Sequence, residues 1–279
     1  MWLTDLPPFV PFFIAALLAL ITRGWIRNLI LLATPVLGGL HLWLDVTPGI
    51  VTAVSIMDYE LILMRTDRLS LLFGYIFHIA AFIAAIFALH VRDTTQTVSS
   101  LLYAGSALGA VFAGDLITLF IFWELLAISS VFLVWAGRSE RAIRSGMRYL
   151  LIQVSSGMLL LAGALVQYYQ TGSLAFDYIG LEGISGWLIF LAFGIKCAFP
   201  LLHTWLIDAY PEATPTGTVF LSVFTTKVAV YALARGFPGT ELLVYIGAVM
   251  TCFPIFYAVI ENDLRRVLAY SLINQLGFM

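Results

Sequence analysis

The chain has 279 residues, of which 61% are apolar and only 11% are charged, and its formal net charge is −2 at pH 7. A soluble domain of this length needs more charged residues to solvate its surface. The composition therefore excludes a soluble domain and indicates a membrane protein. The near-neutral charge gives no sign of a nucleic-acid partner.

Apolar runs of about twenty residues recur along the chain, and each is long enough to cross about 30 Å of hydrocarbon as a helix. They lie at residues 8–22, 27–44, 70–90, 97–113, 116–136, 146–168, 184–202, 216–234 and 240–259, and a tenth begins near Val267. Residues 1–8 lack the basic region and cleavage pattern of a signal peptide, so we expect the first run to be retained. The sequence thus predicts an all-α polytopic membrane protein with about nine to ten transmembrane helices.

A long connection at residues 45–69 separates the second and third runs. It alternates apolar and polar residues from Val51 to Met64, which predicts a small hairpin outside the membrane. We expect three regions along the chain: N-terminal helices with this loop at 1–95, a helical repeat that carries the function at 96–259, and the start of a further helix at 260–279.

The arginines orient the bundle, because cytoplasmic loops carry an excess of positive charge. With the N-terminus outside, nine arginines are cytoplasmic and three are external, and the opposite orientation inverts that ratio. The nine are Arg23, Arg27, Arg92, Arg138, Arg141, Arg144, Arg148, Arg265 and Arg266, and the three are Arg65, Arg68 and Arg235. We therefore predict an external N-terminus.

Three charged residues lie deep inside predicted spans, namely Glu124, Lys196 and Lys227. Each costs about 2.5–3.5 kcal/mol at a helix centre, and such residues usually face a bundle interior or a water-filled cavity. A lysine ammonium loses its proton readily when it is desolvated or lies near another charge, whereas arginine stays charged. One acid and two lysines therefore suit a buried ion pair that exchanges a proton with a second base.

Two simpler interpretations remain open. Glu124 and Lys196 can form a static pair that fixes helix contacts, or the lysines can extend from helix ends toward the membrane surface. The second lysine argues against the static pair, because Lys227 would then be an uncompensated charge. The central positions of both lysines argue against the surface-seeking interpretation.

Pro200 follows Lys196 by four residues and has no N–H for the Lys196 carbonyl, so we predict that the helix breaks at the lysine. His203 lies seven residues after Lys196, on the same face if helical geometry persists, and is a candidate proton relay. His78 is a weaker candidate, and His41 and His90 fall at span ends.

Three strings, GDLITLFIFWELL, the stretch from Gly194 to Arg235, and NDLRRVLAYSLINQLG, resemble the proton-conducting, antiporter-like membrane subunits of complex I and of Mrp-type Na⁺/H⁺ antiporters. Tyr210 to Arg235 is most similar to the D-type subunit of the Mrp-type complexes. The resemblance implies the first inverted repeat of such a protein with a broken seventh helix, in a bacterial inner membrane.

The resemblance also assigns roles. Glu124 matches the glutamate of the fifth helix, Lys196 the lysine of the broken seventh helix, Lys227 that of the eighth, and His203 the histidine of the broken segment. The sequence departs from the family at Ile207, where a proline is usual. It also ends in the tenth of about fourteen expected helices, so we expect a fragment or a split subunit.

The resemblance implies a proton-translocating subunit of a multisubunit monovalent cation/proton antiporter, with other integral-membrane subunits, one supplying the missing helices, as partners. The alternatives are a proton-pumping subunit of a respiratory or hydrogenase complex and a non-conducting assembly subunit. We expect no enzymatic activity, cofactor or metal, because the sequence has no such motif, and its two cysteines, Cys197 and Cys252, are too few for an iron–sulfur cluster.

Overall fold

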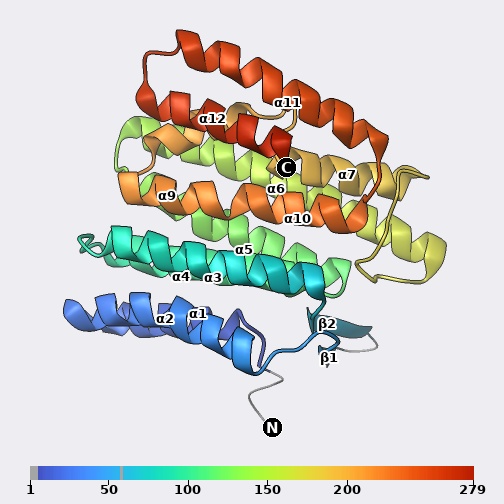
Figure 1. Ribbon diagram of the computed structural model, residues 1–279, viewed down its shortest axis with the longest axis horizontal. Coiled ribbons are helices and arrows are strands. Elements are labelled where there is room, and N and C mark those ends of the chain that lie inside the picture. The colour runs from blue at the N-terminus through green and yellow to red at the C-terminus, as the bar shows by residue number, and fades with distance from the viewer. Residues whose placement is uncertain (1–5, 57–58) are drawn as a thin grey trace. The chain divides into compact units, whose positions relative to one another are not determined.

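The computed structural model describes residues 6–56 and 59–279 (Figure 1). The chain divides into two compact units, Met1–Leu133 and Val134–Met279. Each unit has its own core, and each is built mainly from long apolar helices.

The first unit begins with two helices, α1 (Val10–Ile21) and α2 (Trp25–Leu44), which pack together. A strand pair follows, β1 (Val51–Ile56) and β2 (Tyr59–Arg65). The unit continues with α3 (Arg68–Ala88), α4 (Thr94–Phe112) and α5 (Leu116–Trp135), the last of which ends just beyond the unit boundary. Helix α4 packs on α1 and α3.

Small residues bring α1, α4 and α5 close together. A Cβ added to Gly105 would lie 3.0 Å from the Cβ of Phe12, and one added to Gly109 would lie 2.3 Å from the Phe122 ring. The G-x-x-x-G spacing of α4 therefore leaves room for two aromatic side chains, as expected for helix packing in membranes.

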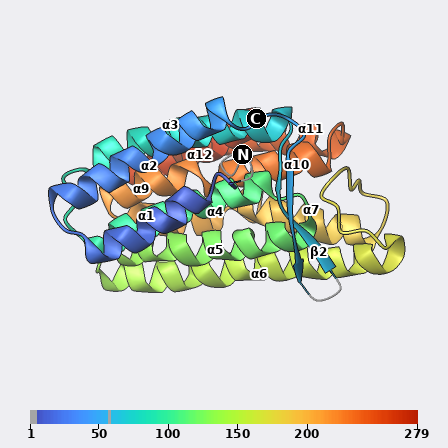
Figure 2. The same cartoon turned by 90° about the horizontal axis from the view of Figure 1, so that it is seen from below.

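The structure contains the predicted hairpin, and its position outside the membrane stays a prediction. Strands β1 and β2 pair antiparallel, with an irregularity between Thr52 and Ala53, and the turn at residues 57–58 lies outside the described residues. Figure 2 shows the strands side by side, running across the direction of the unit's helices.

Asp115 ties this hairpin to the start of α5. Its Oδ2 accepts hydrogen bonds from the Ile62 backbone N–H and the Thr118 hydroxyl, both at 2.7 Å. Its Oδ1 accepts from the backbone N–H groups of Ile117 at 2.9 Å and Thr118 at 2.7 Å. One buried carboxylate therefore caps a helix and holds a strand.

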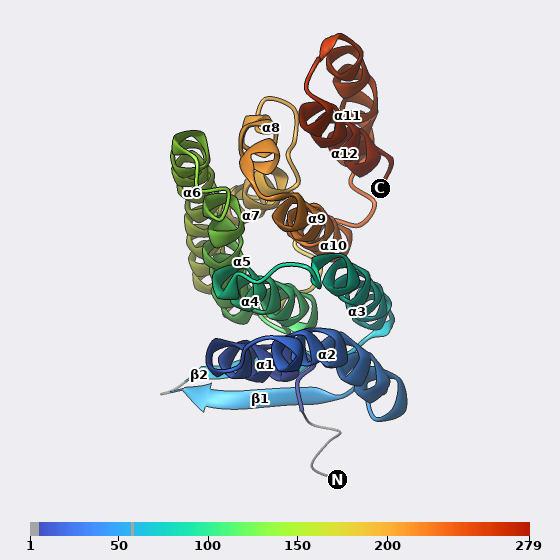
Figure 3. The same cartoon turned by 90° about the vertical axis from the view of Figure 1, so that its left-hand side faces the viewer.

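The second unit begins with a long helix, α6 (Glu140–Thr171), against which α7 (Ile184–Lys196) packs. Two short elements follow, α8 (Thr204–Ala209) and the 3₁₀ helix η1 (Tyr210–Glu212). The unit is completed by α9 (Pro215–Val223), α10 (Thr225–Gly236), α11 (Glu241–Ile260) and α12 (Leu264–Phe278). Figure 3 shows α11 and α12 side by side, in agreement with their contacts.

All ten predicted apolar runs are helical over most of their length, which confirms the all-α polytopic fold. Six helical segments of the described chain are long and apolar enough to cross a membrane, and α1 and α7 are shorter apolar helices. The seventh run breaks at Lys196 as predicted. The eighth run is interrupted at Phe224, which separates α9 from α10, and the segment Pro215–Gly236 as a whole is still long and apolar enough to cross a membrane.

We expect Asp115→Ala to lower the free energy of unfolding by about 2–4 kcal/mol, because it removes a charge-assisted acceptor and leaves buried N–H groups unsatisfied. Denaturant unfolding in detergent micelles measures this change. Asp263→Ala is the control, since Asp263 caps an exposed helix start with one bond to the Arg265 N–H. Equal effects of the two substitutions would contradict a structural role for the hairpin contact.

Candidate functional site

Lys196 is the last residue of α7, and its side chain is fully buried. The chain then leaves the helix through Ala198 and Leu201, whose φ angles of 59° and 71° lie in the left-handed region. The break therefore occurs where Pro200 predicts it. A helix C-terminus carries partial negative charge, so it is a favourable position for an ammonium group.

Neighbouring elements bond the carbonyls at the end of α7. The Ser156 hydroxyl on α6 donates to the Ala192 carbonyl at 2.8 Å, and the Trp205 indole N–H on α8 donates to the Ile195 carbonyl at 2.9 Å. The Phe199 N–H donates to the Gly194 carbonyl at 3.0 Å. The broken end is thus held by fixed hydrogen bonds, which removes the cost of bare carbonyls in an apolar interior.

The broken segment folds back closely on its own helix. A Cβ on Gly194 would lie 2.5 Å from the Phe199 ring, so only glycine leaves room for this approach. Pro200 lies between the two left-handed residues and cannot continue the helix. The local sequence therefore fixes both the position and the direction of the break.

Lys227 lies at a second break, which no proline or glycine announces. Phe224 interrupts the helix, and the half-buried Lys227 ammonium donates to the Ser222 carbonyl in the last turn of α9 at 2.8 Å. A cationic side chain thus caps a helix C-terminus. The sequence signal for such a bend is weak. Hydroxyl side chains can bond to carbonyls of their own helix and bend it, and three of them lie near this break, on Ser222, Thr225 and Thr226.

His203 does not share a helical face with Lys196, so that part of the prediction was wrong. The left-handed Ala198 and Leu201 end the helical geometry between them. His203 instead precedes α8, where its half-buried ring lies 4.9 Å from the Phe253 ring. Its Nδ1 atom is buried and has no hydrogen-bond partner among the described residues, and its role as a relay stays a prediction.

Glu124 belongs to the first unit. It lies half-buried on α5 between the buried Trp123 and the exposed Leu125. The hydroxyls of Ser129 and Ser130 bond to carbonyls of their own helix, so they have the common structural role of serine in membrane helices. The pairing of Glu124 with Lys196 stays a prediction.

His78 makes contacts that are typical of a packed core residue. Its Nδ1 lies 2.7 Å from the Gly74 carbonyl in the same helix, and its buried ring packs edge-on against Phe12. The structure gives it a place in the core of the first unit.

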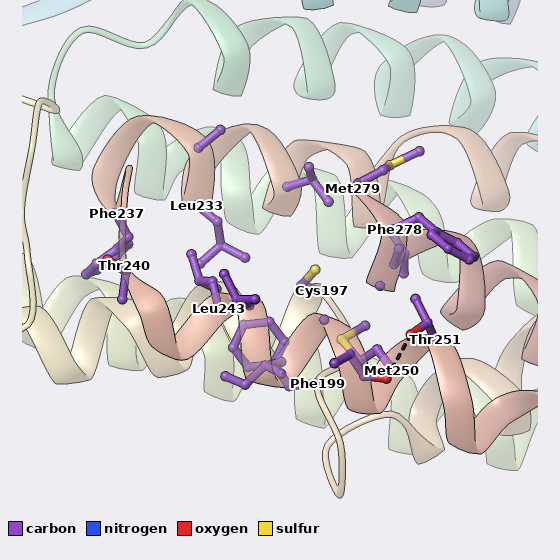
Figure 4. A pocket seen from close by; sticks show the side chains of 18 of the residues that line it. Cys197, Phe199, Leu233, Phe237, Thr240, Leu243, Met250, Thr251, Phe278 and Met279 are labelled. Carbon is purple, nitrogen blue, oxygen red and sulfur yellow. Dashed lines mark hydrogen bonds between the residues drawn. The ribbon is translucent and has the colours of Figure 1, made fainter.

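An apolar cavity of about 670 Å³ lies beside the break in α7 (Figure 4). Cys197 and Phe199 from the broken segment face it, together with side chains of α10, α11 and α12 such as Leu233, Met250 and Thr251. No group of three or more metal-ligating side chains occurs in the described part of the chain. The cavity therefore offers space beside Cys197 and Phe199, with few polar groups in its lining.

Residues 113–279 match the family described as NADH:quinone oxidoreductase/Mrp antiporter, transmembrane. This segment is more than half of the chain and contains Glu124, Lys196, His203 and Lys227. The chain belongs to this antiporter-like family.

Its curated relatives include both branches of the family. The D-type subunit of the Na⁺/H⁺ antiporter of Alkalihalophilus pseudofirmus is 25% identical over 99% of this chain and 62% of its own length. The NAD(P)H-quinone oxidoreductase chain 5 of Synechocystis is 34% identical over 64% of this chain and 30% of its own length. The chain thus spans less than two thirds of these relatives.

Solved structures show the same fold. A chain of the Mrp complex from Dietzia sp. DQ12-45-1b has a TM-score of 0.80 at 23% identity, over 99% of this chain and 57% of its own. A chain of respiratory complex I from Thermus thermophilus has a TM-score of 0.81 at 21% identity, over 97% of this chain and 62% of its own. These two structures therefore show that the chain shares their fold.

Trp205→Phe should lower the free energy of unfolding by about 1 kcal/mol, because it removes the indole N–H from the Ile195 carbonyl while keeping an aromatic ring against Tyr149. Thermal unfolding in detergent measures the change. Trp187→Phe is the matched control, since Trp187 is 51% exposed. A stability loss that is no greater in Trp205→Phe than in the control would show that the indole bond does not hold the break.

Proposed function

We propose that this antiporter-like subunit translocates protons in a multisubunit monovalent cation (Na⁺)/proton antiporter. The observation that carries the proposal is the placement of both lysines of the chain at the carbonyl ends of interrupted helices. Such ends bind cations inside membrane transporters because they present backbone carbonyls without exposing them to lipid. The 25% identity to the D-type subunit of an Na⁺/H⁺ antiporter over 99% of the chain supports the cation/proton assignment.

In this mechanism each lysine alternates between ammonium and amine. Lys196 takes up a proton at the end of α7, where the helix dipole stabilises its charge. Glu124 sets how strongly that proton is held, because a nearby carboxylate favours the ammonium. His203 relays protons. Lys227 accepts the proton next, and the hydrogen bond from its side-chain nitrogen to the Ser222 carbonyl holds that nitrogen in place.

A second candidate is a proton-pumping subunit of a respiratory or hydrogenase complex. It is favoured by relatives named NADH-quinone oxidoreductase chains, of which one is 34% identical. Sodium-dependent proton efflux from inverted vesicles separates the two, since only the antiporter exchanges protons for added Na⁺ without electron transfer. Neighbouring genes for small antiporter subunits would support the first candidate, and genes for quinone-reducing or hydrogenase subunits the second.

A non-conducting assembly subunit is the candidate of another class. In that case the charges only organise helix contacts, and their removal leaves proton flux unchanged in a complex that still assembles. We further propose that the chain lies in a bacterial inner membrane with its N-terminus outside, among other integral-membrane subunits. The excess of arginines on one side of the predicted spans supports this orientation.

Lys196→Arg should abolish antiport, with a loss of at least about tenfold, because guanidinium keeps the charge but cannot release its proton. Antiport in inverted vesicles is the measurement. Arg92→Lys, a swap between the same residue types at a site outside the predicted spans, should leave the rate unchanged. Activity of Lys196→Arg equal to that of wild type would exclude the proton-carrier role.

Glu124→Gln should lower antiport severalfold, whereas Glu124→Asp should retain part of it, because a shorter carboxylate still stabilises the ammonium. The same vesicle assay tests both substitutions, with complex assembly checked by native gel. If the glutamine variant matches wild type, a negative charge at position 124 has no role in transport.

A further inference from the structure

Gln153, near the middle of α6, is fully buried, and both polar atoms of its amide lack a hydrogen-bond partner among the described residues. A buried polar group left without a partner costs about 1–3 kcal/mol. Replacement of such an amide by an apolar side chain of the same shape is therefore expected to be neutral or stabilising. We therefore expect that Gln153 stabilises the folded protein no more than an apolar residue of the same shape would.

The contacts of α6 show which way Gln153 faces. One turn before it, Tyr149 lies with its ring 5.5 Å from the Trp205 ring. One turn after it, the Ser156 hydroxyl donates to the Ala192 carbonyl of α7. Further along the same stripe, the Cβ position of Gly163 lies 2.5 Å from Ile189. Gln153 thus belongs to the face of α6 that packs on α7 and α8.

The facing stripe of α7 ends at the lysine. Ile189, Ala192 and Lys196 are spaced by three and four residues, so they share one side of the helix. Ile189 contacts Gly163, and the Ala192 carbonyl accepts a hydrogen bond from Ser156. Residue numbers therefore increase along α7 as they decrease along α6, so the two helices are antiparallel. The next turn in this antiparallel register brings Gln153 to the level of Lys196.

An amide is chemically suited to this place. Its oxygen accepts a hydrogen bond and its NH₂ group donates two, so it can serve a water molecule in either orientation. Buried waters typically make about three hydrogen bonds to polar groups that lack other partners. A water beside an ammonium accepts from it, and the same water donates to the amine after the proton has left.

We propose that Gln153 is a positioning residue that holds the water through which Lys196 exchanges its proton. The proton passes between this water and the lone pair of the lysine nitrogen, and the amide itself stays unchanged while it keeps the water in line. The inference rests on the proposed proton-translocating function, and it adds a neutral residue of α6 to the charged set that the sequence indicates.

Two further polar atoms of this unit, which lie near the helix breaks, support a hydrated environment. His203 Nδ1 and Thr226 Oγ1 are both buried and have no hydrogen-bond partner among the described residues. Thr226 directly precedes Lys227, and His203 follows the break after Lys196. Polar atoms without protein partners therefore occur near both lysines, where exchanging water serves proton transfer.

The test is Gln153→Met in the assembled complex, because methionine has nearly the shape of glutamine without its amide. We expect an unchanged or raised thermal unfolding temperature, an antiport rate reduced at least about fivefold, and a shift of about half a unit or more in the pH of half-maximal antiport. Gln153→Asn, which keeps the amide one methylene shorter, should restore part of the rate. Gln167→Met, the same swap further along α6, should change neither rate nor pH profile.

Lys196→Ala in the same assay separates this inference from the function on which it rests. If Lys196→Ala transports like wild type, the proposed function is wrong. If Lys196→Ala is inactive while Gln153→Met has the rate and pH profile of wild type, the function stands and the role of Gln153 is overturned. A Gln153→Met complex that loses stability in proportion to its rate would likewise overturn the inference, because the amide would then be structural.

Discussion

Hydrogen-bonding groups of the backbone must be satisfied inside a membrane, and this constraint governs the whole second unit. Two of its helices stop within the apolar interior, and each stop frees carbonyl oxygens. At the first, Ser156 and Trp205 donate to the carbonyls from neighbouring helices. At the second, Lys227 itself donates to the Ser222 carbonyl. Neighbouring side chains therefore satisfy the first helix end, whereas at the second the lysine itself does so.

The two breaks differ in a way that matters for proton movement. The first is fixed by sequence, through Pro200 and the close contact of Gly194 with Phe199, so its geometry does not depend on the charge of Lys196. The second uses the ammonium of Lys227 as a cap, and an ammonium bonds a carbonyl more strongly than an amine does. Loss of a proton from Lys227 should therefore loosen the end of α9, whereas the end of α7 stays rigid.

Much of this architecture follows from the sequence, because apolar runs, alternating strand residues and a proline after a lysine each have a direct structural consequence. The face of His203 was misjudged because left-handed residues such as Leu201 cannot be read from side-chain type. The break at Phe224 was missed because no proline or glycine marks it. Gln153 was missed because a neutral amide carries no charge penalty, and only its burial and its facing helix reveal its position.

The central claim is that both lysines exchange protons at helix ends, and the chain's two lysines make a direct measurement possible. Nitrogen-15 NMR of the protein, labelled only at lysine side-chain nitrogens within the assembled complex, distinguishes ammonium from amine. Lys196→Arg and Lys227→Arg assign the two signals. The account predicts that each signal changes from ammonium to amine within the pH range in which transport occurs. Two signals that remain ammonium throughout that range would contradict it.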